Sequence, residues 1–456
     1  MTADCSSYKE ISEMLSECAV LYVVHCVDTE GPLYEDISAH FQQLKRVFGI
    51  DVEPTRENLV RLQRGLLDLN GAEAAVQELL DPHKITMSGS WSEIDRKLAD
   101  VTAPAFRMQF PDSFGQGWKF SWFCMDHVGF SGNNPRRRAY GHHQIFDHYQ
   151  ALCEKQKMGD VVQFHHHPVS FSGNFNDSGT AYWGRGVLNE IIARKIIDRG
   201  WFPSAYRAGF HTERPDSHWF LEQWIPFDYT SQAMSGRTQK REQPDLSGGR
   251  FGDWRHAPAE WHPYHPHHDD YQRKGNCHRW ITRCLNMHAR LREITPEDVQ
   301  DAFEDVAGGR NAILAFTDHD YKDMKFEIEK VQGMLTAAAK KYPQVRFRYA
   351  DCLTAMRGCL GLANSVIGLH AEIVKTGIHP VLRVSVKGEI FGPQPFLALK
   401  FRNGQYNWDN FDFSETNRWS YTFDANTIPL ELVESVGVAA NNAFGAFEVV
   451  KIDVGE

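Results

Sequence analysis

Two apolar runs, far apart in the chain, each end in side chains that could bind a metal ion or move a proton. Asp28 and Glu30 follow the first run, and His165 and His167 follow the second. Side chains alternate between the two faces of a strand, so each pair would project from a single face. Two carboxylates and two imidazoles at the ends of two buried strands predict a mononuclear site for a divalent metal ion, with a spare base.

Two further strand ends carry polar side chains of the same kind. Arg207 closes the short run 204–207, and His319 follows the apolar run 312–317. In a parallel barrel, active sites collect at the carboxyl ends of the strands. Any one of these residues alone is best explained as a buried polar group with a local partner. Their occurrence at equivalent ends of several strands instead favours one shared site.

The elements that must position these side chains are apolar strands alternating with amphipathic helices. This alternation extends over roughly the first 355 residues and predicts parallel βαβ units. Besides the first two runs, strands are expected at 119–125, 204–207, 225–229, 278–283, 312–317 and 345–349. Helices are expected at 189–199, from 295 onward and at 323–341. Seven or eight such units predict a (β/α) barrel, regular or distorted, over residues 1–355.

The sequence pattern changes near the C-terminal end of the chain, from alternating strands and helices to short strands. From about residue 361, Gly, Asn and Pro turns separate short strands expected at 381–386, 396–401 and 447–452. This pattern predicts a smaller all-β, sandwich-like domain over residues 361–456. We expect that domain to contribute no catalytic residue and to serve docking, oligomerisation or glycan contact.

The composition excludes several classes of protein. The 456 residues are 42% hydrophobic and 24% charged, as in ordinary soluble globular proteins. A net charge of −10, with no Lys/Arg run that suggests a polybasic patch, argues against a nucleic-acid partner. No apolar stretch reaches the roughly 18–20 residues that span a bilayer. The absence of a basic region before Lys9 predicts no secretory signal, and nine cysteines without a C-x-x-C pair predict reduced thiols, so we expect a cytoplasmic protein. The sequence does not indicate an oligomeric state.

These motifs, in this order, resemble those of the polysaccharide deacetylases of the NodB-homology type (carbohydrate esterase family 4). The resemblance is strongest to the branch found in bacterial surface-polysaccharide (O-antigen) gene clusters, called WbmS-type, and it covers roughly residues 18–355. It implies the following roles: Asp28 as catalytic base, Glu30, His165 and His167 as metal ligands, Arg207 as the residue that orients the base, and His319 as catalytic acid.

The motifs depart from the family pattern in two places. The usual pair of adjacent aspartates is here Asp-x-Glu, and the usual His-x-x-x-His is here His-x-His. The two-residue strand period makes both spacings geometrically reasonable. The different spacing leaves the roles of Asp28 and Glu30 exchangeable.

The function that the resemblance implies is a metal-dependent hydrolysis. It would remove an N-acyl group, with acetyl as the first choice, from an amino sugar in bacterial surface-polysaccharide biosynthesis. One divalent ion is expected, with Zn²⁺ as the default and Co²⁺, Ni²⁺ or Fe²⁺ as alternatives. The sugar could be nucleotide-linked, lipid-linked or part of an oligosaccharide. An imidazole such as that of His319 can remain charged beside acidic groups near neutral pH, which suits a catalytic acid.

Four further residues are candidates for substrate contact. Asp126 ends another predicted strand. Trp261, His262 and Tyr264 lie in a His- and Pro-rich string that we interpret as a substrate-facing loop rather than a second metal site. His166 should point away from its two histidine neighbours and have a structural role.

Two other interpretations of the chain remain open. The first is an amidohydrolase-type metal hydrolase acting on another small amide, a class that also uses a His-x-His pair. There the pair normally lies on the first strand, whereas here it comes after about 160 residues and behind an acidic pair. The second is a catalytically degenerate, glycan-binding or assembly protein. The presence of both a candidate base and a candidate acid argues against degeneration.

Overall fold

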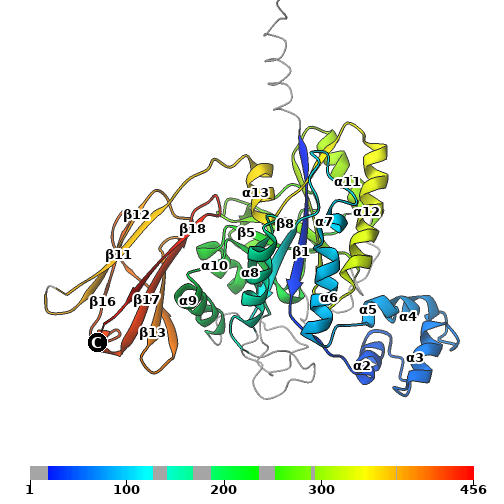
Figure 1. Ribbon diagram of the computed structural model, residues 1–456, viewed down its shortest axis with the longest axis horizontal. Coiled ribbons are helices and arrows are strands. Elements are labelled where there is room, and N and C mark those ends of the chain that lie inside the picture. Colours follow the sequence, from blue (N-terminus) through cyan, green and yellow to red (C-terminus); the bar gives the residue numbers. More distant parts are fainter. Residues whose placement is uncertain are drawn as a thin grey trace, which may run out of the picture.

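A closed barrel of parallel strands forms the centre of the protein (Figure 1). The computed structural model describes residues 19–126, 141–167, 186–235, 252–288, 293–375 and 377–455. In barrel order, the seven strands are β1 (Val20–Thr29), β2 (Phe120–Met125), β3 (Val161–His166), β4 (Ala205–Ala208), β5 (Phe227–Ser231), β8 (Trp280–Asn286) and β9 (Ala312–His319). Strand β9 pairs back with β1 and closes the ring.

An eighth parallel strand, β10 (Arg346–Tyr349), lies outside this ring. It pairs with Val20–Val23 at the start of β1, whereas β2 pairs with the later residues of β1. Strands β10 and β2 therefore share one edge of β1, because β9 occupies the other. The predicted (β/α) barrel is found, in the distorted form with seven closed strands and one additional strand.

Helices cover the outer surface of the barrel. They are α6 (Trp91–Val101), α7 (Pro104–Arg107), α8 (Gln144–Gln156), α9 (Val187–Arg199), α10 (Pro215–Trp224), α11 (Pro296–Ala307) and α12 (Met324–Lys341). The three helices expected from the sequence are α9, α11 and α12. Helix α11 begins with a capping box at Thr295, and α9 ends at Gly200 in a left-handed conformation. Within the described ranges, no helix is both long and apolar enough to cross a bilayer.

Apolar side chains fill the inside of the barrel toward its N-terminal end. Small residues such as Cys26 and Ala315 are fully buried there together with the larger Phe123, Phe227 and Tyr229, and α13 (Cys352–Leu360) closes this end. Such a filled interior leaves polar residues room only at the opposite end, where the strands finish. A second and larger apolar core lies on the outer face, between the strands and the helices.

A small helical lobe follows β1. Its helices are not among those expected from the sequence. It comprises α2 (Ile37–Phe48), α3 (Arg56–Gln63), α4 (Glu73–Leu79) and α5 (Pro82–Ile85), with a core of its own. The lobe leaves and rejoins the barrel at one place, because the Leu33 N–H donates to the Ser88 carbonyl and the Ser88 N–H donates to the Tyr321 carbonyl. Since Tyr321 follows β9, the lobe lies at the carboxyl ends of the strands.

The C-terminal residues form two antiparallel sheets, as expected for a sandwich-like module. One sheet has the order β11 (Gly368–Val374), β12 (Val381–Lys387), β16 (Arg418–Thr422) and β15 (Asp412–Glu415). The other has the order β14 (Tyr406–Asp409), β13 (Phe396–Phe401), β17 (Val433–Asn441) and β18 (Phe447–Asp453). One apolar core draws residues from both sheets, and the second sheet packs against α9 (Figure 1).

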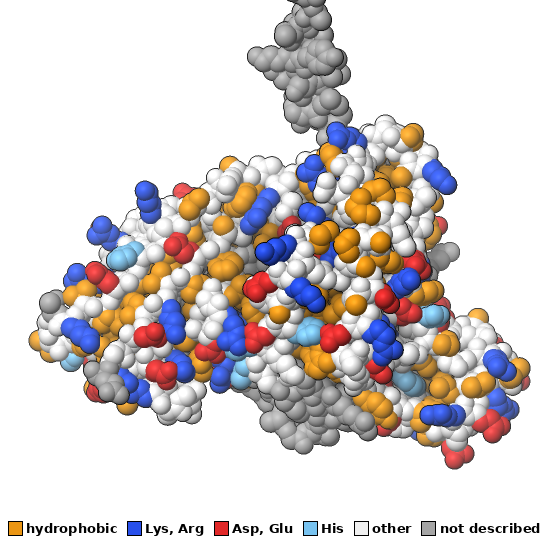
Figure 2. Space-filling model, viewed as in Figure 1, with side chains coloured by type: hydrophobic (Ala, Val, Ile, Leu, Met, Phe, Trp, Pro, Cys, Tyr) orange, Lys and Arg blue, Asp and Glu red, His pale blue; other side chains and the backbone are white. Residues whose placement is uncertain are grey.

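The module is joined to the barrel by buried polar contacts. The Asn441 side chain donates from Nδ2 to the carbonyls of Pro203 and Trp224, at 2.6 and 2.9 Å, and its Oδ1 accepts from Ser204 Oγ at 2.7 Å. Ser204 directly precedes β4. On the face shown in Figure 2, basic and acidic side chains are interspersed over both parts of the molecule.

Candidate metal centre

Three donor side chains meet at the carboxyl end of the barrel. Glu30 follows β1, His165 lies near the end of β3, and His167 follows β3. His167 Nε2 lies 2.9 Å from Glu30 Oε1 and 3.1 Å from His165 Nε2, and His165 Nε2 lies 3.7 Å from Glu30 Oε1. All three residues are buried, and their ligand atoms lie within 4.8 Å of one another. This cluster could hold one metal ion, because imidazole nitrogen and carboxylate oxygen suit several divalent metals.

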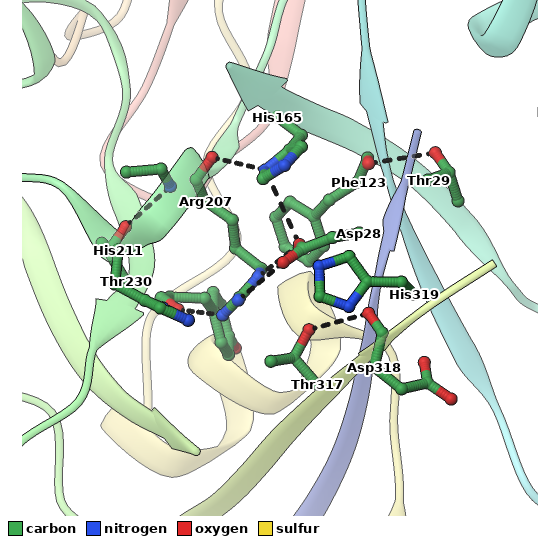
Figure 3. Close-up of polar contacts among 12 residues, drawn as sticks. Asp28, Thr29, Phe123, His165, Arg207, His211, Thr230, Thr317, Asp318 and His319 are labelled. Atoms are coloured by element: carbon green, nitrogen blue, oxygen red, sulfur yellow. Dashed lines mark hydrogen bonds and ion pairs between the residues drawn. The ribbon is translucent and has the colours of Figure 1, made fainter. Parts of the chain in front are cut away.

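The hydrogen bonding of His165 prepares its ring as a ligand. Nδ1 of His165 lies 3.0 Å from the carbonyl oxygen of Arg207 (Figure 3). A carbonyl only accepts hydrogen bonds, so Nδ1 carries the proton and donates it. With the Nδ1 proton directed at this carbonyl, Nε2 is the atom that faces Glu30 and His167. In metal sites, a histidine ligand usually donates a hydrogen bond from its other ring nitrogen, and this bond fixes the orientation of the ring.

Close packing behind His167 holds its ring in place. A Cβ atom added to Gly209 would lie only 2.3 Å from two atoms of this ring, so no other residue fits there without displacing it. The ring of Phe210 packs edge-on against His167 at 4.7 Å. Phe210 and His211 both have positive φ angles, 54° and 49°, a strained backbone for residues with side chains. Trp254 Nε1 donates to the His211 carbonyl at 2.8 Å and supports this strained turn.

Asp28 is held mainly by Arg207, and Nδ1 of His165 lies 3.6 Å from its Oδ1. Arg207 donates from Nε to Oδ1 at 2.6 Å and from Nη2 to Oδ2 at 2.9 Å, and its Nη1 donates to the Tyr229 carbonyl (Figure 3). Burial raises the pKa of Asp28, but the charges of Arg207 and His165 and the hydrogen bonds from Arg207 outweigh burial. The pKa of Asp28 is therefore well below its ordinary value, and the carboxylate stays ionised.

His319 completes the group of six side chains. Its partner across the β1–β9 ladder is Asp28, and its Nε2 lies 3.8 Å from Glu30 Oε1. Figure 3 shows its ring beside Asp28, while the side chain of the preceding Asp318 points the other way. The His319 side chain is 29% exposed, against 2% for Glu30, so it lies at the open side of the cluster.

The charge of His319 differs from the sequence expectation. Burial lowers its pKa, and the nearby carboxylates of Glu30 and Asp28 raise it by less, so that the pKa falls to about 4. The ring is therefore neutral at pH 7 in the metal-free protein. The expectation that acidic neighbours keep it charged is wrong, because the desolvation of the ring is the larger effect.

His166 points away from the cluster, as expected. Its ring stacks on that of Phe164, with centroids 6.2 Å apart and planes at 16°, on the outer face of the barrel. Burial and the positive charge that His167 and His165 could carry lower the pKa of His166 to about 3.

The structure gives Asp126 partners other than the cluster. It directly follows β2 and is buried. Its Oδ1 accepts from the backbone N–H of His143 at 3.0 Å and from Lys195 Nζ at 3.2 Å. Asp126 therefore connects the end of β2 to the start of α8 and to α9.

Trp261, His262 and Tyr264 lie at the opposite end of the barrel. Trp261 accepts from the N–H of Ile313 at the start of β9, and Tyr264 exchanges backbone hydrogen bonds with Ile281 at the start of β8. Nδ1 of His262 lies 2.9 Å from the carbonyl oxygen of Asn311. The expectation that these residues face the substrate is corrected. The loop crosses from Trp254, beside His211, to the N-terminal end of the barrel, a direction that its proline-rich sequence does not indicate. Residues 236–251, which precede this loop in the sequence, lie outside the described residues.

Comparison of the chain with protein-family models, with curated proteins and with solved structures finds no match. The family resemblance therefore rests on the motif residues alone.

Proposed function

We propose that this protein is a metal-dependent hydrolase that removes an N-acyl group, with acetyl as the first choice, from an amino sugar. The observation that carries the proposal is one arrangement of six side chains. A cluster of three metal-binding groups, an ionised Asp28 held by Arg207, and a partly exposed His319 all lie at the carboxyl ends of the barrel strands. Resemblance of these motifs to the polysaccharide deacetylases of the NodB-homology type supports the choice of an amino sugar in surface-polysaccharide biosynthesis.

Glu30, His165 and His167 are the residues that would hold the ion. Two imidazoles and one carboxylate leave further coordination positions open, which is typical of catalytic sites. The donor set favours Zn²⁺, with Co²⁺, Ni²⁺ and Fe²⁺ as alternatives. When bound, such an ion would polarise the acyl carbonyl and make a water molecule more acidic.

Asp28 would act as the general base. Arg207 donates one hydrogen bond to each oxygen of the Asp28 carboxylate, so each oxygen keeps a second lone pair that can accept a proton. The guanidinium keeps Asp28 ionised, so that it can accept a proton throughout the neutral range. A carboxylate with such a low pKa is a weak base. Asp28 could therefore deprotonate the attacking water only because the bound ion would make that water more acidic.

His319 would protonate the departing amine. Hydrolysis of an amide moves one proton from water to the leaving nitrogen, so the site needs a group that can receive and release it. The neutral imidazole of His319 would receive from Asp28 the proton that Asp28 takes from water, and would release it to the leaving nitrogen, since it lies beside Asp28 and at the open side of the cluster. Its partial exposure lets it reach a leaving group that the buried Asp28 cannot reach.

The test combines metal analysis with an assay for acyl release. We would measure the metal content of the purified protein, and then acetate release from N-acetylated amino sugars in nucleotide-linked, lipid-linked and oligomeric form. We expect one divalent ion per chain and acetate release from at least one of these classes. His165→Ala or His167→Ala should remove both properties, whereas the control His166→Ala should keep them. A fully metallated protein that releases acetate from none of the substrates would contradict the proposal.

A further inference from the structure

A fully buried carboxylate, that of Asp320, lies directly behind the metal ligand Glu30. Asp320 follows the last residue of β9. Its Oδ1 accepts from the backbone N–H of Glu30 at 3.1 Å, and its Oδ2 accepts from the backbone N–H of Gly31 at 2.9 Å. Oδ2 also accepts from the hydroxyl of Tyr149 at 2.9 Å. One side chain thus holds two consecutive backbone groups of the turn that carries Glu30.

This turn needs a support of its own. The ladder between β1 and β9 ends at the pair Asp28 and His319, so Glu30 lies beyond it. Beyond this last pair, the hydrogen bonds from Glu30 and Gly31 to the Asp320 carboxylate connect the chain after β1 to the chain after β9. Gly31 then turns the chain with a φ of 68°, and a Cβ on it would lie 3.0 Å from the ring of Trp91. The backbone at Glu30 is therefore fixed on both sides.

The third donor connects Asp320 to the helical layer. Tyr149 belongs to α8 and is fully buried, with its ring 4.9 Å from that of Trp122 on β2. Its hydroxyl reaches the same Asp320 oxygen that accepts from Gly31. The orientation of Asp320 is thus set by a rigid group from outside the barrel.

We propose that Asp320 is a positioning residue for the metal centre, which holds the Glu30 carboxylate in place for the ion, and that Tyr149 fixes Asp320 in turn. The inference rests on the proposed metal site. Both oxygens of Asp320 face N–H or O–H donors, so its role is to orient a ligand rather than to bind the ion. Groups that orient metal ligands typically contribute about 10- to 100-fold to metal affinity.

A purely structural role would produce a different result, and the chain offers a matched control. Asp112 is also a buried aspartate that holds backbone N–H groups. Its Oδ1 accepts from Phe114 and Gln116 at 2.8 Å each, and its Oδ2 accepts from Tyr349 at 2.9 Å. Tyr349 belongs to β10, which pairs with the start of β1, at the other end of the barrel from the cluster. Loss of the Asp112 carboxylate therefore disturbs the fold without touching the metal centre.

The experiment compares Asp320→Asn, Tyr149→Phe and Asp112→Asn in the full-length protein. Zn²⁺ affinity is measured by competition with a chromophoric chelator, Co²⁺ coordination by the visible absorption of the Co²⁺ form, and stability by thermal melting of the metal-free protein. We expect Asp320→Asn to weaken Zn²⁺ binding about 10- to 100-fold and to change the Co²⁺ spectrum. Tyr149→Phe should act in the same direction by a smaller factor. Asp112→Asn should lower the melting temperature but keep the Zn²⁺ affinity and the Co²⁺ spectrum of the wild type.

Two results would overturn the inference. One is wild-type Zn²⁺ affinity and Co²⁺ spectra in both Asp320→Asn and Tyr149→Phe; if Asp320→Asn does not fold, Tyr149→Phe decides alone. The other is a loss of affinity in Asp112→Asn as large as that in Asp320→Asn. A wild-type protein that binds Zn²⁺ but releases no acetate would overturn the proposed function and leave this inference standing. A wild-type protein that binds none of Zn²⁺, Co²⁺, Ni²⁺ and Fe²⁺ would overturn both.

Discussion

Gly209 lies so close to His167 that a Cβ atom on the glycine would be 2.3 Å from the histidine ring. The two residues come from neighbouring strand ends, since His167 follows β3 and Gly209 follows β4. The φ angle of Gly209 is not positive, so the glycine is required for space rather than for an unusual backbone conformation. The absence of a side chain after one strand thus determines where the candidate metal ligand His167, after the neighbouring strand, can lie.

We expect Gly209→Ala to weaken metal binding without removing a ligand. The added methyl group must displace the His167 ring from Glu30, and we expect Zn²⁺ affinity to fall about tenfold or more. Gly333→Ala is the control, because a Cβ there would meet nothing within 4 Å and its φ is not positive. That change should keep the Zn²⁺ affinity and slightly raise the free energy of unfolding. Competition titration of both variants is the measurement, and wild-type affinity in Gly209→Ala would contradict this account of the packing.

A second prediction concerns pH and the buried His25. Trp118 Nε1 donates to its Nδ1 at 2.9 Å, so its Nε2 carries the proton and donates to Asp318 Oδ1 at 2.9 Å. Burial lowers the pKa of His25 to about 3, with Asp160 opposing this effect. Between about pH 6.5 and pH 3, the unfolded chain therefore binds a proton that the folded protein does not. The free energy of unfolding should fall as the pH falls through this window.

His25→Gln isolates this effect, because an amide can accept from Trp118 and donate to Asp318 without titrating. We expect near wild-type stability at pH 7. Below about pH 6.5, the free energy of unfolding should depend on pH less steeply, by up to about 1.4 kcal/mol per pH unit. Urea unfolding of the metal-free protein at several pH values is the measurement. Parallel pH profiles for variant and wild type would show that His25 is not held neutral.

A third prediction tests how the C-terminal module is attached. Asn441→Ala leaves the carbonyls of Pro203 and Trp224 and the hydroxyl of Ser204 without this buried partner. We expect a loss of about 1–3 kcal/mol in the free energy of unfolding, with Zn²⁺ affinity unchanged. The control is Asn403→Ala, an exposed position whose side chain bonds to the nearby Gln405, where a change within about 0.5 kcal/mol is expected. A large loss of metal affinity in Asn441→Ala would show that the module acts on the site.

The sequence allowed the barrel and the cluster to be predicted because both depend on local periodicity. The two-residue period places His165 and His167 on one face and His166 on the other, whatever the rest of the fold. Likewise, the rule that polar residues collect at the carboxyl ends of parallel strands is enough to bring Glu30 to the two histidines.

Features that depend on contacts distant in sequence could not be predicted. Trp261 and Tyr264 are at the wrong end of the barrel for substrate contact, because a proline-rich loop has no periodicity that indicates its direction. The neutral state of His319 depends on how far the folded protein buries its ring. Asp320 was visible beside His319 in the sequence, but its three donors come from the turn after β1 and from α8. The helical lobe from α2 to α5 was not recognised.

The proposed function depends on a division of labour between two carboxylates at the end of β1, with Glu30 as metal ligand and Asp28 as base. Metal analysis and acetate release of purified Asp28→Asn and Glu30→Gln test it most directly. Asparagine still offers Arg207 one acceptor, so we expect Asp28→Asn to keep its metal and to lose activity roughly 10²- to 10⁴-fold. Glu30→Gln should lose metal first, with part of its activity restored by excess Zn²⁺. An Asp28→Asn protein without metal beside a metallated Glu30→Gln protein would contradict the assignment and exchange the two roles.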